Sequence, residues 1–219
     1  MQFNKIVLAT SALALTYFSP ASFAQEKMED PAAKNPAFGI KAGLNIATIT
    51  GDVNDASPRL GVHFGVTAEF KLSDRFSIQP ELLYSMQGVK ETVSEEYLGS
   101  IITGEGTTKM DYINLPVMAK IYLTDGLSLE VGPQIGVLVS GKISYDLNFE
   151  GENVSGTEDA SSELKSVDFA FNAGLGYKLP SGLFFQGRYS LGLTNTYDGD
   201  FDTEGKNGVL QFSIGYQFK

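Results

Sequence analysis

The stretch that decides the fold is the last apolar run of the chain, residues 210–218, which reads Leu-Gln-Phe-Ser-Ile-Gly-Tyr-Gln-Phe. Large apolar side chains occupy every second position, and Gln, Ser and Gly lie between them. A period of two is typical of a β-strand, because successive side chains point to opposite faces. Residues 183–194 repeat the pattern, with Phe185 on one face and Gln186 and Arg188 on the other. Both runs therefore predict β-strands with one apolar and one polar face.

Earlier parts of the chain carry the same alternation. Six further runs lie near residues 38–48, 59–71, 76–89, 109–123, 127–140 and 166–179. Each is as long as the ~9–11 residues that a tilted strand needs to cross a bilayer, or somewhat longer. With the two runs at the end of the chain, they predict eight strands.

The connections between these runs alternate in length. Three are tight turns rich in Asp, Ser, Gly and Pro, namely Leu72–Arg75, Thr124–Gly126 and Pro180–Gly182. Four are longer, namely 49–58, 90–108, 141–165 and 195–207. Short turns on one side and long loops on the other are typical of bacterial outer-membrane barrels. We therefore predict an all-β fold, an eight-stranded antiparallel up-and-down transmembrane β-barrel, with both ends of the barrel domain on the periplasmic side.

The composition of the two faces separates a membrane barrel from a soluble one. A lipocalin-like barrel would turn the apolar stripe inward and the polar stripe to water. Here the polar stripe is rich in Gly, Ser, Asn and Gln, whereas a water-facing stripe normally carries many more Lys and Glu. Aromatic residues such as Phe38, Phe70 and Tyr216 lie near strand ends, as in an interfacial girdle. The sequence favours a lipid-facing apolar stripe, with a soluble lipocalin-like carrier as a lesser alternative.

The N-terminus has the pattern of a secretory signal. Lys5 precedes a short apolar core at 6–15, and Ser22-Phe23-Ala24 places small residues where a signal peptidase reads. We predict a signal peptide at 1–24, a short periplasmic leader at 25–37, and an outer-membrane barrel at 38–219. A short N-terminal anchor helix is the alternative, although the core is shorter than the ~20 residues a spanning helix needs.

Composition excludes several classes of function. The chain has no cysteine and a single histidine, His63, which removes thiol chemistry and most metal and triad sites. Loss of Lys5 with the signal would change the net charge from −10 to −11, and so acidic a chain repels nucleic acid. We predict no cofactor and no nucleic-acid partner. His63 is the only candidate general base, and a lone His inside a polar barrel is more often a hydrogen-bonded filler.

Charged residues on the polar stripe are predicted to face the lumen. The six within the strands are Lys41, Glu69, Glu81, Lys120, Glu130 and Arg188, and those nearer strand ends are His63, Asp168 and Lys178. An eight-stranded barrel is just wide enough for side chains to fill it, so we expect the three acids and three bases to pair. A narrow gated channel is the alternative. Pro80, Pro116 and Pro133 lie on three consecutive strands, where a missing N–H predicts bulges or unpaired ladder positions.

The long connections concentrate acidic residues. The last group, Asp198, Asp200, Asp202 and Glu204, resembles the opening of a calcium loop with oxygen ligands at alternate positions. Thr203 replaces the glycine of position six and Val209 the glutamate of position twelve, so a solvated acidic loop is favoured over this weak metal site. The acidity of these loops would suit a basic protein partner.

Several strands also resemble a known family. The segments are Ile78–Gly88, with its Pro-Glu-Leu and Tyr-Ser, Tyr112–Val117 followed by Lys120, Phe38–Asn45 and Gly132–Gly136. They are similar to strand motifs of the PorT-like outer-membrane β-barrel domain family, which is related in architecture to the OmpA and OmpX barrels. The resemblance implies fold and location for Phe38 to Lys219, and no catalytic or ligand residues. The namesake of the family takes part in a protein secretion system.

The sequence therefore favours a non-enzymatic outer-membrane barrel with a structural or interaction role, as an anchor, an adhesin or a seat for another envelope protein. The predicted partners are outer-membrane lipid, a possible envelope protein and, by similarity to such barrels, the barrel assembly machinery, which would read the final Tyr216-Gln217-Phe218 during insertion. A narrow channel, transport protein or secretion-system component is the second hypothesis. An outer-membrane enzyme is the third, alongside the lipocalin-like carrier.

Overall fold

The computed structural model describes residues 36–51, 56–97, 100–149, 152–197 and 205–218. The predicted signal peptide at 1–24 and most of the leader at 25–37 lie outside these ranges and stay predictions. Among the described residues, no helix is long and apolar enough to span a membrane.

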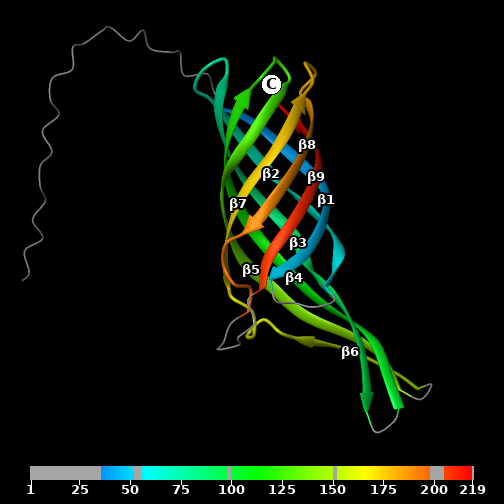
Figure 1. The fold of residues 1–219 in the computed structure, drawn as a ribbon. Helices are drawn as coiled ribbons and strands as arrows, with labels where there is room; N and C mark the ends of the chain where they lie inside the picture. Colours follow the sequence, from blue (N-terminus) through cyan, green and yellow to red (C-terminus); the bar gives the residue numbers. More distant parts are fainter. Residues whose placement is uncertain (1–35, 52–55, 98–99, 150–151, 198–204, 219) are drawn as a thin grey trace, which may run out of the picture. The chain divides into compact units, whose positions relative to one another are not determined.

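The described residues form nine β-strands (Figure 1). Their bounds are β1 Ala37–Gly51, β2 Ala56–Lys71, β3 Phe76–Tyr97, β4 Ser100–Tyr122, β5 Leu127–Phe149, β6 Glu152–Asp159, β7 Val167–Lys178, β8 Leu183–Gly192 and β9 Gly205–Gln217. Every pairing between them is antiparallel. Leaving out β6, each strand pairs with its neighbours in chain order, and β9 returns to β1. These eight strands close an up-and-down barrel, which confirms the predicted fold class.

The barrel closes between the first and last strands. Gly39 pairs with Gln217 in the β1–β9 ladder, and the Phe218 N–H donates to the Phe38 carbonyl oxygen at 2.8 Å. The three tight turns lie where the sequence predicts them, at the end of the barrel that also carries the C-terminus (Figure 1). In one of them Gly182 has a φ of 96°, a conformation that favours glycine.

The apolar stripe faces outward. On β9, Phe212 and Ile214 are 52% and 50% exposed, whereas Gln211 and Ser213 between them are 2% and 8% exposed. The same alternation repeats around the ring, and large apolar side chains remain uncovered on every barrel strand. A soluble lipocalin-like barrel would have the opposite arrangement. The outer wall therefore suits hydrocarbon, and the polar stripe fills the interior.

The apolar wall has the height of a bilayer core. On β5, outward apolar residues run from Leu129 to Val139, ten positions apart. At about 3.3 Å per residue and a strand tilt of about 35–45°, they span about 23–27 Å along the barrel axis. This agrees with the apolar band of about 25 Å on membrane barrels.

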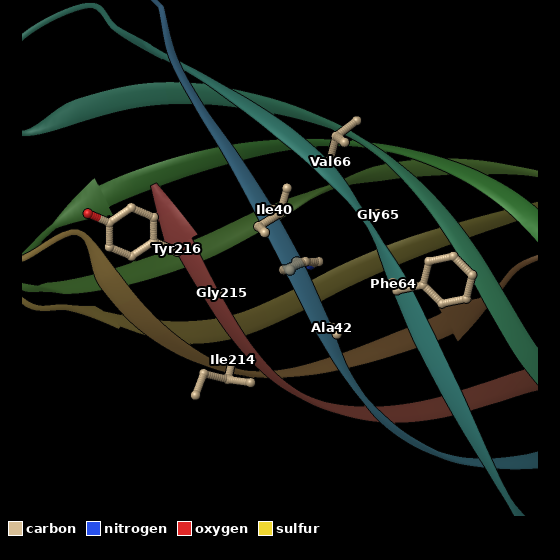
Figure 2. Close-up of a pocket in the computed structure, with 9 residues that line it drawn as sticks. Ile40, Ala42, Phe64, Gly65, Val66, Ile214, Gly215 and Tyr216 are labelled. Carbon is tan, nitrogen blue, oxygen red and sulfur yellow. The ribbon is translucent and has the colours of Figure 1, made fainter. Parts of the chain in front are cut away.

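A hollow of about 520 Å³ lies on this wall over β9, β1 and β2. Figure 2 shows Ile40, Phe64 and Ile214 around Ala42, whose small side chain leaves the space. Ala42 pairs with Phe64 on one side and Ile214 on the other, so the hollow belongs to the lipid-facing surface. It is not a site for a polar ligand.

The prediction of long loops is wrong for two of the four long connections. The segments 90–108 and 141–165 are largely strand, because β3, β4 and β5 continue past the barrel (Figure 1). β3 and β4 pair to their shared hairpin at Tyr97 and Ser100, and β6 pairs with the end of β5. We call this extension of β3, β4 and β5, together with β6, the protruding sheet.

A single bulge in β5 reverses the faces at the base of the protruding sheet. Asp111 pairs with Ser140 but Tyr112 pairs with Leu138, which leaves Val139 as an extra residue. An extra residue moves every later side chain to the opposite face. Before the bulge, apolar residues at odd positions face lipid. After it, the odd positions face the concave side that continues the lumen, and they hold Ile143, Tyr145 and Leu147.

The three strand prolines interrupt the hydrogen-bonded ladder without changing its register. The β3–β4 pairing runs to Pro80 opposite Val117 and resumes at Leu83 opposite Asn114. The β4–β5 pairing has a similar gap after Pro116, on the stretch that faces Pro133. Proline has no N–H to donate, so unpaired positions were expected at these points.

Candidate functional site

The lumen holds a network of buried charges at its centre. The structure places all six predicted lumen charges inside the barrel, each 5% exposed or less. Arg188 on β8 donates two hydrogen bonds to the Glu81 carboxylate on β3, at 2.9 and 3.0 Å. The Lys41 ammonium on β1 lies 2.7 Å from the same carboxylate, and Gln79 donates to it at 2.8 Å. Glu81 therefore ties three walls of the barrel together.

Glu130 on β5 forms the second half of this central network. Arg188 reaches it at 3.2 Å, and the Lys120 ammonium lies 3.3 Å away. Gln186 donates to both carboxylate oxygens, at 3.0 and 3.1 Å, and also accepts from Lys41 at 3.3 Å. Each carboxylate of the centre is thus met by at least two cations and one amide.

A second network closes the short-turn end of the lumen around Glu69. Its carboxylate accepts from the Tyr122 hydroxyl at 2.5 Å and from the Gln217 amide at 2.7 Å. The Lys178 ammonium lies 3.3 Å from it, and the Lys120 ammonium, at 3.9 Å, connects it to the central network. Sequence reasoning placed Lys178 near a strand end and overlooked Tyr122 and Gln217. Lys178 on β7, Tyr122 on β4 and Gln217 on β9 each occupy a position whose alternation with the outward apolar residues places the side chain inside the barrel. That alternation was the signal that could have identified them.

These contacts make the lumen a filled interior. Burying a charge without a partner is costly, and a buried charge becomes tolerable when opposite charges and hydrogen bonds surround it. All three acids have both opposite charges and hydrogen bonds, and Arg188 and Lys178 reach Glu81 and Glu69 across the lumen. An eight-stranded barrel leaves little space beyond its own side chains. The arrangement therefore cross-links the strands of the barrel through its interior.

His63 lies in a polar layer next to the central network. One ring nitrogen, Nδ1, is 2.7 Å from the Asn45 side-chain oxygen, and the other, Nε2, is 2.7 Å from the Ser213 hydroxyl. A serine, a base and an orienting group in this order resemble a hydrolytic triad. However, His63 is 1% exposed and Asn45 is fully buried, between the charge networks and the loop-side end of the lumen. The three side chains satisfy one another where a substrate has no access.

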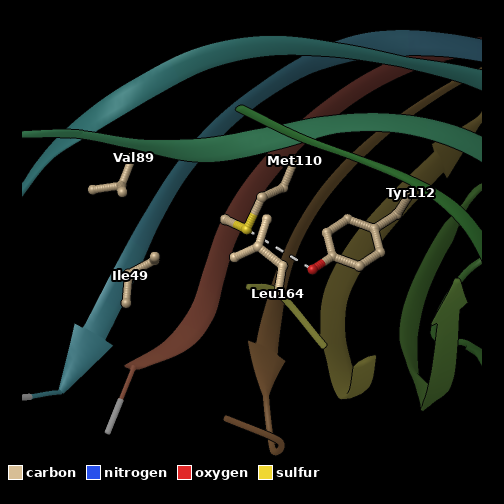
Figure 3. Packing of buried hydrophobic residues seen from close by; sticks show 5 residues of the cluster. All are labelled: Ile49, Val89, Met110, Tyr112 and Leu164. Carbon is tan, nitrogen blue, oxygen red and sulfur yellow. Dashed lines mark hydrogen bonds between the residues drawn. The ribbon is translucent and has the colours of Figure 1, made fainter. Parts of the chain in front are cut away.

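The loop-side end of the lumen holds an apolar cluster. Ile49, Val89, Met110 and Tyr112 point inward from β1, β3 and β4, and Leu164 joins them from the segment after β6 (Figure 3). Leu164 is 3% exposed and forms a β-bridge with Tyr197. The connection between β6 and β7 therefore folds into the barrel mouth and covers it. Sequence reasoning missed this cluster, because Leu164 stands alone in a polar segment.

The other predicted site residues do not form a second site. Asp168 is buried and accepts from the Thr194 hydroxyl at 2.8 Å, away from the charge networks. The weak metal site at Asp198, Asp200, Asp202 and Glu204 lies outside the described residues. In the ranges that the structure describes, no cluster of three or more His, Asp or Glu side chains is arranged to hold a metal ion.

Several solved outer-membrane proteins are similar to this chain. Ail, the attachment invasion locus protein of Yersinia pestis, in complex with the heparin analogue sucrose octasulfate, is 15% identical over 84% of this chain and 100% of that chain, with a TM-score of 0.46. A major outer membrane protein from Thermus thermophilus is 15% identical, with 84% of this chain and 100% of that chain covered and a TM-score of 0.45. Neisserial surface protein A is 9% identical, with 83% of this chain and 97% of that chain covered and a TM-score of 0.43.

The family is given by the sequence itself. No curated protein sequence matches this chain significantly. The family described as outer membrane protein beta-barrel domain matches residues 23–198, which is most of the chain. Together with the closed ring of strands and the outward apolar wall, this match places the protein in the outer membrane. The chain belongs to the outer membrane protein beta-barrel domain family.

Proposed function

We propose that this protein is a non-enzymatic, non-conducting barrel with a structural or interaction role in the cell envelope. The observation that carries the proposal is the filled lumen. Two linked charge networks occupy the short-turn half, and an apolar cluster occupies the loop-side end. Such an interior stabilises a barrel and offers ions no continuous aqueous path.

The inaccessibility of the only candidate base supports the same proposal. His63 is the only histidine of the chain, and its two ring nitrogens are engaged by Asn45 and Ser213. A membrane-barrel enzyme needs its nucleophile and base where a substrate can reach them. Ser213 is 8% exposed and points into the lumen.

The protruding sheet supports the interaction role. It carries acidic residues along its length, from Glu158 near the barrel to Glu91, Glu105 and Asp146 further out. Opposite charge guides a protein to its partner and fixes the orientation of the complex. An envelope protein with a basic surface is therefore the partner we propose. Outer-membrane lipid surrounds the barrel wall, and the barrel assembly machinery is its partner during insertion.

Ion conductance in planar bilayers tests the proposal. The folded protein is expected to give no discrete current steps, even after long recording at high salt. Leu164→Gly, which opens the apolar cluster, should remain silent because the charge networks still close the lumen. Glu81→Ala combined with Glu130→Ala and Arg188→Ala removes the centre of the network and should be the first variant to leak. Reproducible openings of the unaltered protein would contradict the proposal.

We also infer membership of the PorT-like group within the family. The motifs that suggest it have structural roles, since Pro80 and Pro116 lie at ladder gaps and Glu81 and Lys120 belong to the charge networks. A part in a secretion system is the alternative role that this membership brings. Co-purification with other envelope proteins after gentle membrane extraction would favour it, whereas isolation of the barrel alone would not.

A further inference from the structure

Three lysines gather on the outer face where the strands leave the barrel. They are Lys90 on β3, Lys109 on β4 and Lys142 on β5. Lys109 and Lys142 are direct cross-strand partners, an arrangement in which like charges repel each other. Lys90 lies one row further along the same face, opposite Thr107. A pair of ammonium groups held side by side favours an anion between or above them.

The acidic groups near these lysines are already engaged. Asp159 pairs with Lys142 in the β5–β6 ladder, and its carboxylate also accepts from the Ser161 N–H at 3.0 Å. Asp111 precedes Tyr112 on β4, accepts from the Tyr84 hydroxyl at 2.7 Å and interacts electrostatically with Arg59. Three lysines thus face two aspartates at this level of the outer face, which leaves a small excess of positive charge.

The lysines stand at the edge of the apolar wall. On β4 the last outward apolar residue is Ile113, and Lys109 follows four positions away. On β5 the last is Val139, and Lys142 follows three positions away. The long connections of such barrels face the cell exterior, so this edge meets the head groups of the outer leaflet. Basic side chains at that level meet the phosphates of anionic lipids.

A polar groove of about 420 Å³ starts at Lys109 and runs outward along the protruding sheet. Hydroxyl groups of Thr107, Ser144 and Thr157 line it, and those of Ser144 and Thr157 lie 3.0 Å apart. Glu105 and Asp146 form its far end. Hydroxyls donate and accept hydrogen bonds and ionised carboxylates accept them, which matches the needs of sugar hydroxyls. The groove thus continues the lipid-facing wall with a surface suited to carbohydrate.

We propose that this groove binds the phosphorylated sugar head group of an outer-leaflet glycolipid. The phosphate lies against Lys109 and Lys142, and the sugars extend along Thr107, Ser144 and Thr157. The acyl chains of the same molecule lie on the apolar wall below. The negative charge of Glu105 and Asp146 keeps phosphate away from the far end of the groove and so sets the direction of the head group. This site is on the outside of the barrel and does not depend on whether the lumen conducts.

The test measures which lipids stay around the folded full-length protein. The protein is placed in phosphatidylcholine vesicles that contain a minor fraction of rough lipopolysaccharide, and small lipid discs are cut from them with an amphipathic polymer. The ratio of lipopolysaccharide to phosphatidylcholine in protein-containing discs is compared with that in empty discs. We expect enrichment by the unaltered protein, reduced about fivefold for each lysine removed by Lys109→Gln and Lys142→Gln.

Control variants separate this site from general attraction. Lys71→Gln with Arg75→Gln removes the same charge from the exposed turn at the opposite end of the barrel and should leave the enrichment unchanged. Lipopolysaccharide stripped of phosphate should lose the lysine dependence, and Thr157→Val should weaken binding only when the core sugars are present. Heat-modifiable gel migration verifies that each variant is folded. Equal losses in the two pairs of variants, or enrichment independent of phosphate, would overturn the proposal.

Discussion

Strand β5 has two halves that obey opposite rules. In the barrel, Ile135 faces outward and Gln134 faces the lumen, whereas beyond the barrel Ser144 faces outward and Tyr145 faces the concave side. Apolar residues keep to odd positions in both halves, apart from Leu138, and only Gly141 breaks the odd series between them. The reversal is produced by one extra residue, Val139, at the edge of the membrane. The odd, apolar positions of β5 thus face lipid inside the membrane and the inner side of the sheet outside it, although the spacing of apolar residues in the sequence stays the same.

The comparison shows how a strand can leave a bilayer without exposing apolar residues to water. Hydrocarbon favours apolar side chains on the outer face, and water outside the membrane favours polar ones. On β4 the change is made by sequence alone, since Ile113 gives way to Asp111 and Lys109 on the same face. On β5 it is made by the bulge. Neighbouring strands therefore use two different devices at the same height.

The largest effect is expected inside the barrel, from Arg188→Leu. The change leaves Glu81 without its bidentate partner and Glu130 without one of its two cations. Breaking a buried ion pair in this way costs about 3–5 kcal/mol. Urea titration of the protein in lipid vesicles, followed by heat-modifiable migration, measures the loss. Asp125→Asn, in the exposed β4–β5 turn, should stay within about 0.5 kcal/mol of the unaltered protein, and an equal loss there would refute the role of the network.

A matched pair of lysine substitutions tests the two halves of β5 directly. Ile135→Lys places a charge near the middle of the apolar wall and should cost about 2–4 kcal/mol. Ser144→Lys places the same charge on the outer face of the protruding sheet, where surface substitutions stay within about 0.5 kcal/mol. The same urea titration compares them. Similar costs at both positions would mean that the protruding sheet also lies in hydrocarbon.

Deletion of Val139 should turn the protruding half of β5 inside out. Ile143, Tyr145 and Leu147 would then face water, while Lys142 would move to the concave side. Each of these apolar residues is half-buried, so losing their burial should lower the local stability of the β5–β6 hairpin by about 2 kcal/mol. Limited proteolysis should cut the hairpin faster and leave the barrel intact. Unchanged cleavage would show that the bulge does not set the faces.

Much of this architecture could be predicted from the alternation of residues, and the exceptions have physical causes. The interior position of Glu81 and Arg188 followed from parity alone, because a period of two assigns faces without further information. The extension of β5 was also encoded, since Ile143, Tyr145 and Leu147 continue the alternation after Ser140 and Gly141. The side they face was not encoded, because a bulge depends on the register of the partner strand.

Other features depend on contacts between distant segments. β6 contains one large apolar residue, Val154, and no alternation, so only its pairing with β5 makes it a strand. Leu164 closes the barrel mouth through neighbours on β1, β3 and β4. The partners of each lumen charge also could not be chosen from sequence, because parity gives the face of a side chain and not the wall that it reaches. Lys178 illustrates this, since it crosses to Glu69 on β2.

The smallest effect is expected from Gly156→Ala on β6. A Cβ at this position would meet the Tyr145 hydroxyl and ring, which lie over the glycine on the concave face. Because Tyr145 is a side chain and can move aside, the cost should be about 1 kcal/mol, the low end for added volume. Hydrogen exchange should quicken in β6 and the end of β5 and stay unchanged in β8 and β9. If protection fell around the whole ring instead, the protruding sheet and the barrel would be one cooperative unit, and the division of β5 into two halves would describe its chemistry but not its stability.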